Sequence, residues 1–329
     1  MTKSIREVRI DAIRTIAICG VIATHSGLIY FGRFGVQLFF AITGYLIANL
    51  TNLTPSKFLI RRFFRLYPLF LFFLISILVL QITNLIQPSI SELIHPVQLV
   101  LSFSMLSNLI PGSAFIAGSW SVSNEWIFSW LAIFKNYIER YFIVLFIFLI
   151  SAQLMLQFMA LKFENLTSFA PGSEKYWIFV WINTLNPVVN AAFFILGFGI
   201  RVNKIKLVNS KFICVLGILS AIFIDLYVGH VMPIWLMACY LIFSLCWNLK
   251  YTSFQKLLFN YVGRRTYGIF LGHYFIIELT NPYFPSNFLG NTSQFFVVLI
   301  AAALIGELTW RLIEKPSLKL SGILERKIH

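Results

Sequence analysis

The feature that most constrains this sequence is a succession of apolar runs close to twenty residues long, separated by short segments that hold most of the charge. A helical run of this length matches the roughly 30 Å hydrocarbon core of a bilayer. Hydrophobic residues make up 59% of the chain and charged residues 12%, which excludes a water-soluble globular domain. We therefore predict an all-α polytopic membrane protein with one membrane-embedded domain over residues 1–329.

The apolar runs predict about ten transmembrane helices. We interpret the first run as a retained helix and not a signal peptide, because no small-residue cleavage site follows a short apolar core. The segment 97–111 carries serine and asparagine and ends in Pro111-Gly112, so we expect it to be re-entrant or interfacial. The ten spans are expected at 10–30, 34–53, 64–83, 120–135, 141–160, 176–200, 212–229, 233–249, 265–280 and 294–312.

The positions of the basic residues predict the orientation of these spans. With both termini in the cytoplasm, 23 of the 26 lysines and arginines fall on the inner side, and Arg33, Lys162 and Lys175 fall outside. Counting 97–111 as a full span would invert every later loop and remove this bias. The net charge of +14 is therefore expected to report orientation in a membrane, not binding of nucleic acid.

Arg14 and His25 lie at the two ends of the apolar stretch RTIAICGVIATH. Eleven residues of α-helix return to within about 20° of the starting direction and rise about 16 Å. The two side chains are therefore expected on one face of one helix, about half a bilayer apart. Ionisable side chains inside a bilayer are costly unless they face a cavity or a partner, so both are candidate site residues.

Glu125 lies in SWSVSNEW, at the expected outer end of the span 120–135. This places it in the same outer half of the membrane as His25. A histidine oriented by a carboxylate is the usual arrangement of a general base that acts on a hydroxyl. We therefore predict that Glu125 and His25 belong to one site.

Other polar residues in the apolar spans leave alternatives open. An asparagine stripe in the span 176–200 serves either as interhelical hydrogen bonding or as a cavity lining. Glu307 and Arg311, four residues apart, are expected to pair. The four cysteines show no metal-ligand spacing and are expected to be small core residues. The asparagines of the stripe are Asn183, Asn186 and Asn190.

Six sequence blocks resemble, in order, the motifs of the acyltransferase-3 type integral membrane O-acyltransferases that modify bacterial surface glycans. The resemblance covers residues 8 to 318. Three departures are Gln37, where an acid is common, Thr43, where serine is usual, and a single glutamate at Glu125, where a pair is frequent. The blocks are IDAIRTIAICGVIATH with Asp11, Arg14 and His25, GVQLFFAITGYLIA from Gly35, the basic loop FLIRRFFRLYP at 58–68, WSVSNEW from Trp120, GRRTYGIFLGH from Gly263 to His273, and RLIEKP from Arg311 to Pro316.

The resemblance implies roles for particular residues. His25 would act as general base towards a sugar hydroxyl or would carry the acyl group covalently. Glu125 would orient the imidazole or bind the sugar. Arginine's planar fork suits phosphate oxygens, although anchoring of the basic loop at the cytoplasmic face is the alternative for part of this set. The arginines expected at the phosphates of acyl-CoA are Arg14, Arg61, Arg62 and Arg65, and the residues expected at the substrate are Trp120, Ser121, Asn190 and His273.

We therefore predict an O-acyltransferase that moves an acyl group, most often acetyl, from cytoplasmic acyl-CoA to a hydroxyl of a cell-surface polysaccharide or lipid-linked glycan. O-antigen, lipopolysaccharide, exopolysaccharide and peptidoglycan all remain open as acceptors, as does the oligomeric state. Acetyl-CoA is expected as a co-substrate, with no permanently bound cofactor and no metal. Larger relatives carry an extracytoplasmic SGNH hydrolase-like domain, which is not expected here, so a second transfer step would need a partner.

The alternative function is a transporter or flippase of a glycan or lipid-linked sugar. About ten helices with a polar interior suit such a protein equally well. Transporters often show inverted repeats and paired broken helices, and no such symmetry is evident in this sequence.

Overall fold

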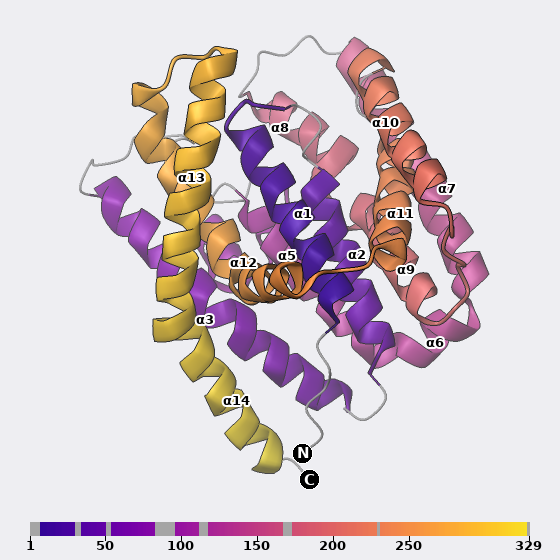
Figure 1. Ribbon diagram of the computed structural model, residues 1–329, viewed down its shortest axis with the longest axis horizontal. Coiled ribbons are helices and arrows are strands. Elements are labelled where there is room, and N and C mark those ends of the chain that lie inside the picture. Colours follow the sequence, from indigo (N-terminus) through magenta and orange to yellow (C-terminus); the bar gives the residue numbers. More distant parts are fainter. Residues whose placement is uncertain are drawn as a thin grey trace.

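The computed structural model describes residues 7–29, 34–50, 54–82, 96–111, 118–166, 173–228 and 231–327, and the regular structure of these residues is entirely helical. Figure 1 shows α13 and α14 on one side of the molecule, α7 and α10 on the other, and α1 and α2 between them. The α-helices are α1 Val8–His25, α2 Phe34–Ala48, α3 Pro55–Ile82, α4 Pro96–Phe103, α5 Ser119–Trp130, α6 Lys135–Arg140, α7 Phe142–Leu166, α8 Glu174–Val180, α9 Pro187–Arg201, α10 Lys211–Val228, α11 Met232–Asn248, α12 Ser253–Thr280, α13 Phe288–Thr309 and α14 Lys315–Lys327.

Five short turns of tighter or wider helix join some of these elements. Two are π-helical, Trp181–Leu185 between α8 and α9 and Trp310–Glu314 between α13 and α14. The others are the 3₁₀ turns Ser107–Leu109, Leu131–Phe134 and Asn281–Tyr283.

The described residues contain four segments that are long and apolar enough to cross a membrane: Pro55–Leu80, Phe142–Glu164, Lys175–Arg201 and Phe288–Arg326. The shorter apolar helices α2 and α11 fall on two further expected spans. The all-helical, multi-pass membrane architecture is therefore confirmed, while the count of ten spans stays a prediction.

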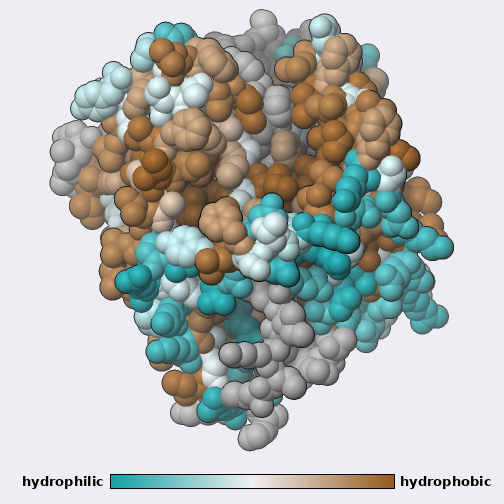
Figure 2. Space-filling view, viewed as in Figure 1, coloured by the Kyte–Doolittle hydropathy of each residue, from teal (hydrophilic) through white to brown (hydrophobic). Residues whose placement is uncertain are grey.

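The outer surface and the core divide cleanly among the helices. Apolar side chains on α7, such as Ile143 and Val144, are about two-thirds exposed, at 68% and 67%. Such a surface suits contact with lipid. In contrast, α2 and α9 are almost wholly buried. Figure 2 shows hydrophobic residues over the upper part of the visible face and hydrophilic residues gathered across its lower part.

Helices α2 and α9 approach so closely that two glycines are required at their contact. A Cβ added at Gly44 would lie 1.9 Å from the carbonyl oxygen of Phe194, and one added at Gly197 would lie 1.8 Å from that of Ala41. Small residues at such a crossing allow two backbones to pack directly. This contact fixes α2, and with it the side chains that α2 contributes to the interior.

Two expected boundaries are wrong. The segment 58–68, interpreted as a loop, lies inside α3, which already begins at Pro55. The span expected at 120–135 is broken into α5, a 3₁₀ turn and α6. The expected span is therefore not one continuous α-helix.

The serines and asparagines of α5 explain why it is an internal helix. Asn124 Nδ2 donates to the carbonyl of Leu185 at 2.8 Å, and Ser123 Oγ accepts from the backbone N–H of Asn108 at 3.1 Å. Asn108 Nδ2 also donates to Asn124 Oδ1 at 2.7 Å. Irregular backbone at membrane depth is tolerated where other protein segments satisfy its polar groups.

The segment 97–111 does not form one continuous helix, in agreement with the sequence-based interpretation. Helix α4 ends at Phe103, Met105 adopts a left-handed conformation with φ 55°, and a 3₁₀ turn follows at Ser107–Leu109. Eight residues of α4 rise about 12 Å, which is too short to cross a bilayer.

The expected pairing of Glu307 with Arg311 is also present. Arg311 Nε donates to Glu307 Oε1, and Arg265 Nε of α12 donates to the other carboxylate oxygen. One carboxylate therefore joins α12 to the end of α13.

Candidate active site

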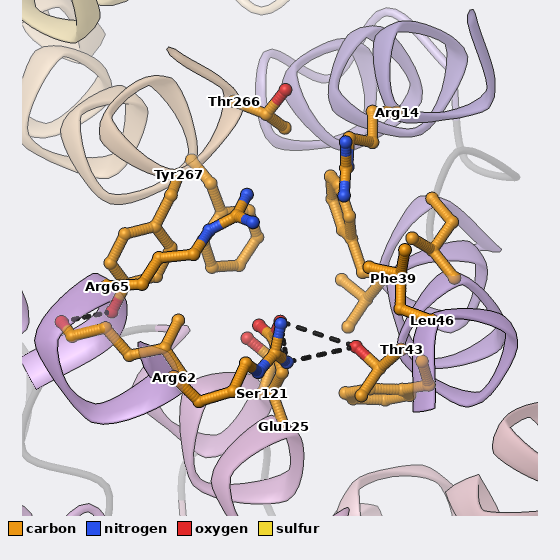
Figure 3. A pocket seen from close by; sticks show the side chains of 15 residues that line it. Arg14, Phe39, Thr43, Leu46, Arg62, Arg65, Ser121, Glu125, Thr266 and Tyr267 are labelled. Carbon is orange, nitrogen blue, oxygen red and sulfur yellow. Dashed lines mark hydrogen bonds and ion pairs between the residues drawn. The ribbon is translucent and has the colours of Figure 1, made fainter. Parts of the chain in front are cut away.

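A pocket lies between α1, α2, α3, α5 and α12, with about 570 Å³ of space when the open solvent at its mouth is included. Figure 3 shows the guanidinium groups of Arg14 and Arg65 pointing into it from opposite sides, with Arg62 at its base. The pocket therefore collects three cations from two helices. Its polar lining consists of Arg14, Thr43, Arg62, Arg65, Ser121, Glu125, Thr266 and Tyr267.

The base of the pocket is a buried ion pair between α3 and α5. Arg62, only 6% exposed, donates from a terminal guanidinium nitrogen (NH2) to Glu125 Oε1 at 2.6 Å and to Thr43 Oγ1 at 3.2 Å. Its Nε donates to Ser129 Oγ at 3.1 Å. Buried charges need such pairing and hydrogen bonding to offset their lost hydration. The network therefore fixes both the guanidinium and the carboxylate.

Arg14 is held by the first residue of its own motif. A terminal guanidinium nitrogen of Arg14 (NH1) donates to Asp11 Oδ1 at 2.8 Å, one helical turn away. Asp11 is fully buried against α12, where a Cβ on Gly263 would lie 2.5 Å from the same carboxylate oxygen. The Asp-x-x-Arg block and the Gly263 block therefore meet at one contact that positions Arg14.

Arg62 and Arg65 are three residues apart on α3, so they project from one side of the helix towards the pocket. Arg61 points elsewhere, because it is turned by about 100° around the helix axis relative to Arg62. Arg61 forms a two-point ion pair with Glu325 of α14 and does not line the pocket.

A second cluster lies at the other end of α1. The Tyr274 hydroxyl is 2.7 Å from His25 Nε2, and the two ring centroids are 4.5 Å apart. The ring of His273 lies 5.4 Å from that of His25. His25 is exposed, whereas His273 is fully buried.

His273 is locked by its own helix. Its Nδ1 contacts the carbonyl oxygen of Phe270, so Nδ1 carries the proton and donates. Among the described residues, Nε2 of His273 has no hydrogen-bond partner. The phenyl ring of Phe270 lies 5.6 Å from the His273 ring and also lines the pocket, so this side chain separates the pocket from the histidine cluster.

The expected pairing of Glu125 with His25 is not what the structure shows. Helix α5 begins beside Tyr274, since a Cβ on Gly118 would lie 2.6 Å from that ring. Glu125 follows Gly118 by seven residues and therefore lies about 10 Å further along the helix, at the level of Arg62. Its carboxylate orients an arginine, and the described residue hydrogen-bonded to His25 is Tyr274.

The other residues expected at the substrate are dispersed. Ser121 lines the pocket, although its hydroxyl donates to the Gly118 carbonyl at 2.7 Å. Trp120 packs edge-on against Phe40 at 6.2 Å. Asn190, outside the pocket lining, donates its amide to the carbonyls of residues 184, 185 and 186 at the π-turn.

The structure brings in residues that the sequence analysis did not assign to the site. Thr43 bridges the ion pair, and its place in the second block was already noted as a departure from serine. Tyr267 lines the pocket and donates to the Leu66 carbonyl at 3.0 Å. Tyr274 follows Tyr267 by seven residues, so the two lie on nearly the same face of α12, and this spacing was a readable signal.

The fold and the two clusters define a class: a multi-pass helical protein in which five of the six motif blocks contribute residues to an arginine-lined pocket or to a histidine cluster. This chain belongs to the acyltransferase-3 family, since the family's acyltransferase domain matches residues 7–311. It is similar to the peptidoglycan O-acetyltransferase OatA of Listeria monocytogenes, with 26% identity over an alignment of 365 positions. The alignment covers 93% of this chain and 55% of that protein, so the chain spans about half of the relative's length. No solved structure matches the chain.

Proposed function

We propose that this protein is a membrane O-acetyltransferase that moves an acetyl group from cytoplasmic acetyl-CoA to a hydroxyl of a cell-surface glycan. The observation that carries the proposal is that α1 contributes one residue to an arginine-lined pocket and another to a histidine cluster. Arg14 contributes to a pocket with three arginines, and His25, eleven residues further along the same helix, lies in a cluster of ionisable rings. The two ends are about 16 Å apart along the helix.

The pocket suits the phosphate-bearing part of the donor. Guanidinium groups bind phosphate oxygens through paired, charge-assisted hydrogen bonds. Arg62 is partly neutralised by Glu125, and Arg14 by Asp11. These carboxylates hold the arginines in place before the donor arrives, which reduces the entropy lost on binding. The flexible pantetheine arm would then extend past Phe270 towards His25.

The histidine cluster suits the transfer step. His25 accepts the proton of the acceptor hydroxyl while the hydroxyl oxygen attacks the thioester carbon. The carbon–sulfur bond breaks, and the CoA thiolate leaves with a proton delivered back from the imidazolium. General base catalysis of this kind contributes about 10²–10⁴-fold in rate.

For the acceptor, the relative's name favours peptidoglycan over O-antigen or lipopolysaccharide. Both are glycans with free sugar hydroxyls, so the family alone does not separate them. Peptidoglycan fragments are accordingly the first acceptor to test.

The proposal includes the topology predicted from the positive charges, with ten spans and both termini in the cytoplasm. Figure 2 supports it, because hydrophilic residues gather on the side of the molecule where α6 and α14 lie in Figure 1. In that orientation the end of α1 near Arg14 faces the cytoplasmic donor, and His25 faces the outer leaflet. The acetyl group would thus cross the membrane within the protein.

The test is acetyl transfer by the purified protein in lipid nanodiscs. Acetyl-CoA labelled in the acetyl group is supplied with soluble peptidoglycan fragments in one arm and O-antigen oligosaccharide in another. We expect ester-linked acetate on the peptidoglycan fragments by mass spectrometry. His25→Gln should lower kcat by about 10²–10⁴-fold, since glutamine keeps hydrogen bonding but not basicity.

Arg65→Gln separates donor binding from chemistry in the same assay. Loss of one charge-assisted hydrogen bond should raise KM for acetyl-CoA by about 10- to 100-fold while kcat changes little. If acetate appears on O-antigen alone, the acceptor is O-antigen and not peptidoglycan. If neither glycan is acetylated, while reconstituted vesicles move a labelled lipid-linked sugar across the bilayer, the protein is a transporter and the proposal is wrong.

A further inference from the structure

We propose that Tyr274 is a positioning residue for His25, whose phenol oxygen fixes the imidazole and stabilises its protonated form during acyl transfer. This inference rests on the proposed function, and its test is separable from the test of that function.

The two side chains meet although they are 249 residues apart in the sequence. The phenol oxygen of Tyr274 lies 2.7 Å from His25 Nε2, and the rings are tilted by 55°. This contact joins the last residue of α1 to the second half of α12. It is therefore a property of the fold and not of local sequence.

His25 needs such a partner because its own position does little to fix the ring. It is exposed at the end of α1, where the chain turns through Ser26 and through Gly27 with φ +68°. An exposed side chain at a helix end retains several rotamers. A hydrogen bond from a partner that is itself held in place selects one of them.

Tyr274 is held in place from two sides. A Cβ at Gly118 would lie 2.6 Å from its ring, and Gly118 has φ +85°, a conformation that glycine adopts at little cost. The preceding residue, His273, is fully buried, and its ring centroid lies 4.3 Å from that of Tyr274 with the two rings tilted by 44°. The contacts with Gly118 and His273 therefore hold the Tyr274 ring and its hydroxyl in place.

In the proposed arrangement Nε2–H of His25 is the donor and the phenol oxygen of Tyr274 is the acceptor, and this assignment determines which nitrogen of His25 does the chemistry. With Nε2–H donating to the phenol oxygen, the lone pair is on Nδ1, and Nδ1 accepts the proton of the sugar hydroxyl. The resulting imidazolium keeps its Nε2–H bond to the phenol, which strengthens as positive charge develops. The proton on Nδ1 then passes to the departing CoA thiolate, so proton and charge balance over the cycle.

Two titratable groups that lie against His25 are His273 and Tyr274, both from α12. From α13, Asn291 contributes an uncharged amide that donates to the Gly27 carbonyl at 2.8 Å. A change in the pH profile on removing the phenol hydroxyl can thus be interpreted in terms of His25 and its neighbours His273 and Tyr274.

The experiment is Tyr274→Phe in the nanodisc assay, with kcat, KM for acetyl-CoA and the pH dependence of kcat measured. We expect kcat to fall by about 10- to 100-fold, the range for a hydrogen bond to a charged group, with KM unchanged. The acidic limb of the profile should move to lower pH, because the oxygen that stabilised the protonated imidazole is gone.

Tyr240→Phe is the matched control, since Tyr240 donates a phenol hydrogen bond of 2.7 Å to the Lys206 carbonyl, away from the histidine cluster. It should leave kcat and the pH profile as in the wild type. A Tyr274→Phe profile that does not move, or that moves to higher pH, overturns the proposal. If the wild-type protein itself transfers no acetyl group, the proposed function has failed, and that outcome is distinct from an unchanged Tyr274→Phe.

Discussion

The two ends of helix α1 are built in opposite ways. At the Arg14 end, called the inner end below, Arg14 is buried, at 9% exposure, and belongs to a pocket that holds two ion pairs: Arg14 with Asp11 and Arg62 with Glu125. At the His25 end, called the outer end below, His25 is exposed, and the rings of His273 and Tyr274 lie beside it.

The difference reflects what each end can exchange with its surroundings. Charges in a low-dielectric interior interact strongly and are costly to separate, so the ion pairs at the inner end hold its side chains in place. An exposed imidazole is easily reached from solvent and can both accept and donate a proton. The inner end thus suits binding of an anionic donor, and the outer end suits proton transfer.

The largest effect on stability is expected from breaking the inner ion pair. Arg62→Leu leaves the Glu125 carboxylate without its cation, and Glu125→Leu leaves the guanidinium alone. Because the Glu125 side chain is 21% exposed, each should destabilise the protein by about 3 kcal/mol, the lower end for a broken buried pair. The unfolding midpoint in detergent micelles measures the change.

The double variant Arg62→Leu/Glu125→Leu sharpens this prediction. Replacing both charges by apolar side chains removes the unpaired group, so most of the lost stability should return. Additive losses in the double variant would show that the two residues are not coupled and that the inner end is not held by this pair. A matching cycle at the outer end, His25→Leu with Tyr274→Phe, should show much smaller changes in stability.

A smaller effect is expected from crowding the contact of α2 with α9, which places Thr43 beside the ion pair. Gly197→Ala puts a methyl group into space occupied by the Ala41 carbonyl. Overpacking of this kind costs about 1–3 kcal/mol. Because α2 must shift, KM for acetyl-CoA should rise while the pH profile set at the outer end stays in place.

Gly322→Ala in α14 is the control for this substitution, because nothing lies within 4 Å of its added Cβ. It should leave stability equal or slightly higher, since alanine favours a helix more than glycine by about 1 kcal/mol. If both variants behave alike, the close contact of α2 with α9 is not what positions the pocket.

The helical, membrane-embedded architecture was predictable because apolar length is a local property of the sequence. The non-spanning character of 97–111 and the pairing of Glu307 with Arg311 were predictable for the same reason: each depends on residues within one or two turns. The placement of Arg14 beside the phosphate-binding candidates Arg62 and Arg65 also agrees with the sequence analysis.

The partners of His25 and Glu125 could not be predicted in the same way. Depth was inferred from the position of Glu125 in an expected span, but α5 is a short internal helix that starts beside Tyr274 and carries Glu125 towards Arg62. The tilt and offset of such a helix depend on long-range packing. Thr43 lies within a motif block and Tyr274 directly follows one, yet nothing local shows which residue each would face.

The smallest effect is expected for a substitution at Arg61. This residue is next to Arg62 in the sequence but does not line the pocket, so it tests whether lining the pocket is what matters. Arg61 pairs with Glu325 on the outside of α3, where its side chain is 49% exposed. The Glu325 side chain is buried, at 9%, but the Arg61 charge is half exposed and glutamine can still donate to the carboxylate, so Arg61→Gln should cost about 1 kcal/mol and shift the unfolding midpoint only slightly. KM for acetyl-CoA should stay within about twofold of wild type, in contrast to Arg65→Gln, because a screened charge outside the pocket adds little to binding. A tenfold rise in KM for Arg61→Gln would instead extend the donor site beyond the pocket to the contact of α3 with α14.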